Sequence, residues 1–167
     1  YLSVKLDPKA EHAWNGLGWS RFNQGQRKEA LKAFHKCIEL SPKHPAALNG
    51  LGQVYYFEGD LQQAETYLKK AAPQASAAWY GLAKLYLLKG EYKKALPYAR
   101  KIVAATPDDD WAKQMLEAAK NGELPEDLKA LIAPPDWEET SSKNAEDEAP
   151  ASEKRKLSQE DREQSQD

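Results

Sequence analysis

The most constraining feature of the sequence is a segment that occurs three times. It begins at Trp14 with W-N-G-L-G-W-S, at Leu48 with L-N-G-L-G-Q-V and at Trp79 with W-Y-G-L-A-K-L. The spacing is about 34 residues between the first two starts and slightly shorter between the second and third. This period predicts a stacked array of one small structural unit, because a single unit of this size cannot bury its apolar face alone.

Each copy has the pattern of two consecutive helices joined by a glycine turn. Apolar residues recur at helical spacing, and Gly25, Gly59 and Gly90 separate the members of each pair. The six helices are expected over residues 9–24, 26–40, 45–57, 61–72, 75–88 and 91–104. Pro97 lies inside the last of them and predicts a bend, because a proline ring clashes with the carbonyl four residues earlier at a cost of about 3 kcal/mol.

The region after the repeats divides into a helical part and a polar part. A helix over 108–121 has its apolar residues on one side, as expected of the cap that closes a repeat array, and a short helix is expected over 125–132. Residues 138–167 contain one large apolar residue, Leu157, so we predict that this tail is disordered.

The sequence therefore predicts six segments. The expected boundaries are 1–8 for the end of a preceding truncated repeat, 9–44, 45–75 and 76–109 for three units, 110–133 for the capping and short helices, and 134–167 for an acidic tail. Charge follows the same division: residues 1–122 hold 18 Lys and Arg against 12 Asp and Glu, a balance of +6, whereas residues 123–167 hold 6 against 14, a balance of −8. A mildly basic body thus carries an acidic tail.

The copies resemble the tetratricopeptide repeat, whose pattern is W-x2-L-G-x2-Y, then A-x3-F, then P, over about 34 residues. The first copy supplies Trp14, Leu17, Gly18, Ala30, Phe34 and Pro42. Arg21 departs from the tyrosine of the pattern, and Leu48 replaces the tryptophan in the second copy. The resemblance implies an all-α solenoid of stacked antiparallel helix hairpins in a right-handed superhelix, with a C-terminal capping helix and a disordered tail.

The same resemblance implies a non-enzymatic scaffold for protein–protein interaction that binds a peptide segment of a partner in its concave groove. The groove positions it implies are Asn15, Trp19, Asn23, Asn49, Gln53, Tyr56, Tyr80 and Lys84. Aromatic rings supply contact area, and amides can hydrogen-bond a peptide backbone. The cationic clamp with which some members grip a terminal carboxylate is missing, because its places hold Asn15, Trp19, Gly50, Ala77 and Gly81.

Several alternatives stay open at this point. Gly16, Gly50 and Gly81 recur at equivalent places, which indicates close approach either of a ligand or of an adjacent helix. An RNA-binding helical-repeat module is the first alternative function, although a scattered excess of +6 does not favour nucleic acid. A regulatory repeat region of a larger enzyme is the second. An apolar edge left by the half-repeat at the start leaves homo-oligomerisation open.

No pattern of catalytic or cofactor chemistry is visible. His12, His35 and His44 lack metal-ligand spacing with each other or with Cys37, which is expected to be a buried core thiol. We therefore expect no metal, no cofactor and no enzymatic activity. No apolar run approaches the roughly 18 residues of a membrane span. The sequence does not define a compartment, and the cytoplasm is the default expectation.

Overall fold

The computed structural model describes residues 8–135 and 137, and in this part it contains eight helices and no strand. The helices are α2 (Pro8–Asn23), α3 (Arg27–Leu40), α4 (Pro45–Phe57), α5 (Leu61–Ala71), α6 (Ala77–Leu88), α7 (Tyr92–Ala105), α8 (Asp110–Asn121) and α9 (Glu126–Ile132). The chain divides into units 1–134 and 135–167, and the description below concerns the first. The tail predicted to be disordered, 138–167, lies outside the described residues.

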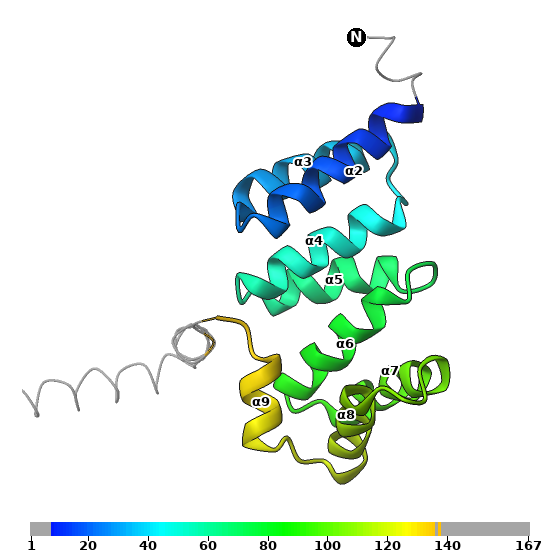
Figure 1. Cartoon of the computed structure of the whole chain (residues 1–167), viewed down its shortest axis with the longest axis vertical. Coiled ribbons are helices and arrows are strands. Elements are labelled where there is room, and N and C mark those ends of the chain that lie inside the picture. Colours follow the sequence, from blue (N-terminus) through cyan, green and yellow to red (C-terminus); the bar gives the residue numbers. More distant parts are fainter. Residues whose placement is uncertain (1–7, 136, 138–167) are drawn as a thin grey trace, which may run out of the picture. The chain divides into compact units, whose positions relative to one another are not determined.

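Successive helices pair into three hairpins, α2 with α3, α4 with α5 and α6 with α7, and each hairpin packs on the next (Figure 1). The helix ends agree with the sequence-based expectation to within two residues, and α4 agrees at both ends. The predicted all-α solenoid of helix hairpins is therefore confirmed. Within the described part, no helix combines the length and the apolar character needed to cross a membrane.

A buried phenyl ring joins the first hairpin to the second. Phe34 of α3 is fully buried, and it lies between Gly18 of its own hairpin and Gly50 of the next. A methyl group on either glycine would come within 2.5 Å of the ring. These glycines therefore lack a side chain because Phe34 occupies the space.

The second and third hairpins meet in the same way. Leu68 of α5 is fully buried between Gly52 and Gly81, where an added Cβ would approach its side chain to 2.5 and 2.8 Å. Of the two explanations that the sequence leaves open for Gly50 and Gly81, packing against an adjacent helix is thus confirmed. Gly16 differs, because no described atom beyond its own helix lies within 4 Å of its Cβ position.

The first hairpin is also less covered than its neighbours. Leu17 belongs to the repeat pattern and is expected in the core, yet it is 39% exposed, whereas the equivalent Leu51 and Leu82 are fully buried. The difference arises because Leu51 and Leu82 face a preceding hairpin, and no described hairpin packs on that face of α2.

The last hairpin contains the internal proline. α7 continues through Pro97 as one helix from Tyr92 to Ala105, so the residue does not interrupt the element. The predicted bend in its axis stays a prediction.

The hairpins are arranged so that their first helices line the inner side of the stack. α2 contacts α4 and α4 contacts α6, whereas α3, α5 and α7 approach one another less. The side of α2, α4 and α6, here called the concave face, is therefore the more tightly curved one. After the hairpins, α8 packs on α7 and α6, and α9 returns alongside α6 (Figure 1).

Candidate peptide-binding face

A row of aromatic rings joins α2 to α4, two of the helices that line the concave face. The Trp19 and Phe22 rings meet edge to face at 5.8 Å between centroids, and Phe22 meets Phe57 at 5.3 Å. Trp19 also packs edge to face on the core residue Phe34, at 5.4 Å. Trp19 and Phe22 are half-buried and Phe57 is 36% exposed, so part of each ring remains available for contact.

Amide side chains border this row. Asn49 is buried, and its Oδ1 accepts a hydrogen bond of 3.5 Å from Gln53 Nε2, while Asn23 is exposed. Asn15 is half-buried, and its Oδ1 is buried without a hydrogen-bond partner in the described part of the chain. A buried acceptor without a donor is costly, but this oxygen is out of reach of a ligand, so the exposed amide of Asn23 is the accessible one here. We call Asn15, Trp19, Phe22 and Asn23 the open end of the concave face.

The other end of the face is closed by the chain itself. Tyr56 is only 2% exposed, and its hydroxyl donates a hydrogen bond to the carbonyl of Ile132 in α9. Burial raises the pKa of Tyr56 above its usual range. Phe22, which stands one repeat earlier at the equivalent place, is half-buried. The helix that covers Tyr56 therefore has no counterpart over Phe22 in the described structure.

Two aliphatic side chains of α9 are buried. Leu128 and Ile132 lie four residues apart on one face of the helix and are 2% and 3% exposed, whereas Leu131 is 60% exposed. Full burial of each stabilises docking by about 1.5–3 kcal/mol. A seven-residue helix is unstable alone in water, so α9 depends on this packing for its helical form.

Lys84 of α6 completes what we call the closed end, defined by Tyr56 and Lys84, the residues that α9 adjoins. Its ammonium lies 4.9 Å from the centroid of the Tyr56 ring, a cation–π distance, and no acidic group of the described residues forms an ion pair with it. Burial lowers the pKa of Lys84.

Tyr80 is engaged with the capping helix. Its hydroxyl donates a hydrogen bond to the Asp109 carboxylate, whose other oxygen accepts from the backbone N–H groups of Trp111 and Ala112 at 2.9 and 3.2 Å and so caps α8. This hydrogen bond raises the pKa of Tyr80 and lowers that of Asp109. Of the expected groove residues, the structure therefore pairs Asn49 with Gln53 and Tyr56 with Lys84, while Tyr80 holds α8.

An ion-pair network fixes α6 against the preceding hairpin. Glu65 of α5 accepts hydrogen bonds from the Tyr86 hydroxyl at 2.7 Å and from Lys89 at 3.3 Å, and it pairs with Lys69 at 3.0 Å. Burial opposes the charged carboxylate, but these hydrogen bonds outweigh it and lower the pKa of Glu65 to about 2. The network positions α6, and with it Lys84, relative to α5.

Two features of the structure are missed by reasoning from the sequence. The helix over 125–132 is expected, but its return onto Tyr56 is not; the spacing of Leu128 and Ile132 is the available signal. His12 and His44 meet with 3.5 Å between Nδ1 and Nε2, and His44 Nδ1 accepts from the Ala47 N–H to cap α4. Among the residues that the structure describes, no group of three His, Cys, Asp or Glu could hold a metal.

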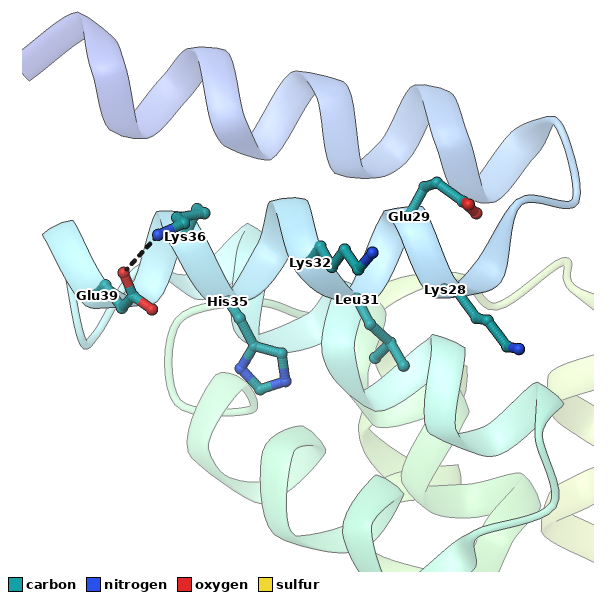
Figure 2. Close-up of a pocket in the computed structure, with 7 residues that line it drawn as sticks. All are labelled: Lys28, Glu29, Leu31, Lys32, His35, Lys36 and Glu39. Carbon is teal, nitrogen blue, oxygen red and sulfur yellow. Dashed lines mark hydrogen bonds and ion pairs between the residues drawn. The ribbon is translucent and has the colours of Figure 1, made fainter.

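Two further features lie on α3, a buried thiol and a surface hollow. Cys37 is fully buried, and burial, with the Glu11 charge adding to it, raises the pKa of its thiol to about 11, far from a reactive thiolate at pH 7. The hollow in Figure 2 is lined by α3 alone, and Lys36 in it is paired with Glu39 at 3.4 Å.

In a comparison with known protein families, the family described as "Tetratricopeptide repeat" matches residues 21–75 and 58–119. Together these residues make up more than half of the chain. The chain belongs to the tetratricopeptide repeat family. A curated relative, the photosystem I assembly protein Ycf3 of Rippkaea orientalis (strain PCC 8801 / RF-1), is 25% identical over 79 residues, which cover 42% of this chain and 46% of the relative. The tetratricopeptide repeat chain thus spans about half the length of the relative it matches.

Proposed function

We propose that this repeat protein is a non-enzymatic scaffold that binds a peptide segment of a partner protein on its concave face. The observation that carries the proposal is the aromatic row from Trp19 through Phe22 to Phe57. Trp19 packs on the core residue Phe34, and each of the three rings keeps part of its surface exposed. Rings held in this way offer rigid contact area at little further entropic cost.

The amides beside the row support a peptide in particular. The exposed Asn23 amide can both donate a hydrogen bond to a peptide carbonyl and accept one from a peptide N–H. Membership of the tetratricopeptide repeat family supports a role in protein–protein interaction, and the relative Ycf3 is an assembly protein by name. We accordingly expect a partner that is itself part of a protein assembly.

Site-specific photo-crosslinking tests the proposal. The full chain would carry benzoylphenylalanine at Asn23, on the open end, or at Lys36, an exposed position on the outer side of α3. We expect the Asn23 probe to crosslink a partner that the Lys36 probe does not. Binding of that purified partner should then weaken at least tenfold in Asn15→Ala/Asn23→Ala, with unchanged circular dichroism. Equal crosslinking from both probes, or full affinity in the double variant, would remove the concave face as the site.

A further inference from the structure

α9 occupies the concave face as a ligand would. It is not part of any hairpin, and it reaches back across the chain so that the carbonyl of Ile132 receives the hydroxyl of Tyr56, 76 residues earlier. Tyr56 is buried as a consequence, although it stands at a place where the first hairpin leaves Phe22 half-exposed. The last helix of the folded unit thus covers Tyr56, one of the groove positions that the resemblance to the family implies.

A surface hollow and a short link separate α9 from its neighbour α8. A hollow lies between the two helices, bordered by Gln114, Glu117 and Asn121 of α8 and by Leu128 of α9. The connection begins at Gly122, whose φ of 66° ends α8, and no side chain caps the start of α9. α9 packs alongside α6 and is hydrogen-bonded to Tyr56 of α4, while residues 123–125 form the short link that connects it to α8.

The contacts define the chemistry of the segment that fits. Two branched aliphatic side chains four residues apart, Leu128 and Ile132, are buried, while the acidic first turn of Glu126 and Asp127 is exposed. The helix ends with a carbonyl on Tyr56, whose ring carries the ammonium of Lys84. The negative end of a helix dipole is thus directed toward a positively charged part of the face.

We propose that the closed end is a docking site for a short amphipathic helix with aliphatic residues at positions i and i+4, and that α9 is its intramolecular occupant. A partner helix of the same kind must displace α9, so α9 regulates access to this half of the concave face. The proposal rests on the proposed function and adds its regulation. It leaves the open end accessible, because Trp19 and Phe22 are only half-buried and Asn23 is exposed.

Exchange of α9 in trans tests this directly. The probe is a fluorescein-labelled peptide of residues 124–134, LPEDLKALIAP, titrated with full-length chain and followed by fluorescence anisotropy. Three chains are compared: wild type, Leu128→Ser/Ile132→Ser, and the matched control Leu131→Ser, which changes the exposed leucine of the same helix. We expect the double variant to bind the peptide at least tenfold more tightly than wild type or the control, because its own α9 no longer competes.

Two variant peptides and the oligomeric state of wild type serve as controls. A peptide with Leu128→Ser and Ile132→Ser should not bind, a peptide with Leu131→Ser should bind like the original, and wild type should elute as a monomer. A double variant that is folded by circular dichroism yet binds no more peptide than wild type overturns the proposal. So does a double variant that fails to fold, which would make α9 a permanent part of the core, or a wild-type dimer that exchanges α9. None of these results bears on the crosslinking test of the open end, so the two proposals can fail separately.

Discussion

The two ends of the concave face are built from equivalent residues and yet differ in what covers them. Phe22 and Tyr56 stand one repeat apart, but Phe22 is half-buried beside Trp19, whereas Tyr56 is sealed under α9 and bonded to Ile132. The repeat pattern therefore determines where a side chain points, and segments outside the pattern determine whether it can be reached. The predictions below test this contrast, from the largest effect to the smallest.

The largest difference is expected between alanine variants of the two rings. Tyr56→Ala removes a fully packed ring and the anchor of α9, so it should lower the free energy of unfolding by about 3–5 kcal/mol. Phe22→Ala removes a ring that is already partly in water, and it should cost about 1–2 kcal/mol. Urea denaturation of both variants measures the difference. Equal losses would show that the two ends are packed alike.

Alanine substitution of two equivalent glycines should change the free energy of unfolding in opposite directions. Gly50→Ala puts a methyl group within 2.4 Å of the Phe34 ring and should destabilise the chain by about 1–3 kcal/mol. Gly16→Ala meets no described atom within 4 Å and should stabilise α2 by up to about 1 kcal/mol through helix propensity. Thermal unfolding followed by circular dichroism gives both signs. A stabilising Gly50→Ala would contradict the packing described for Phe34.

Removing one hydroxyl should loosen α9 alone. Tyr56→Phe deletes the donor to the Ile132 carbonyl, at an expected cost of about 1 kcal/mol. Hydrogen exchange should then speed up several-fold at the amides of Lys129 and Ala133, which close the hydrogen bonds of α9. The control is Tyr55→Phe, because the Tyr55 hydroxyl has no hydrogen bond in the described part. Unchanged exchange in Tyr56→Phe would mean that this bond does not hold the helix.

The smallest effect concerns the charge of Lys84. Its pKa is lowered by burial in the folded chain, so the folded state releases a proton below the ordinary value of 10.5. The unfolded state binds more protons in that window, and stability contributed by this group therefore rises with pH up to about the ordinary pKa. Lys84→Met should abolish this rise and alter stability at pH 7 by less than about 1 kcal/mol.

The free energies of unfolding of wild type and Lys84→Met are measured between pH 7 and 10.5. The control is Lys101→Met, because Lys101 is an exposed lysine that lies over the Trp79 ring. Subtracting each variant from wild type removes the contribution of the tyrosines, which titrate in the same range. If wild type and Lys84→Met keep a constant difference over this range, Lys84 is not the source of the pH dependence.

Much of the fold can be predicted because its signals are local. Period, glycine turns and prolines place the helices, and the prediction for α4, from Pro45 to Phe57, is confirmed at both ends. For the candidate site, the sequence predicts only which side chains face the groove, and not which residues they contact. Whether Tyr80 meets Asp109, or Tyr56 meets Ile132, depends on how segments beyond the repeats fold back. Such long-range contacts leave no periodic trace in a single sequence.

The shared side chains between hairpins have a consequence for how the array melts. Phe34 fills space in two hairpins at once, and Leu68 does the same one step further along. Unfolding of either hairpin would expose the space that its neighbour shares with it. The interfaces between hairpins therefore contribute to the free energy of unfolding as well as the hairpins themselves. We therefore expect disruption to spread along the stack from its ends, with the central hairpin of α4 and α5 the last to give way.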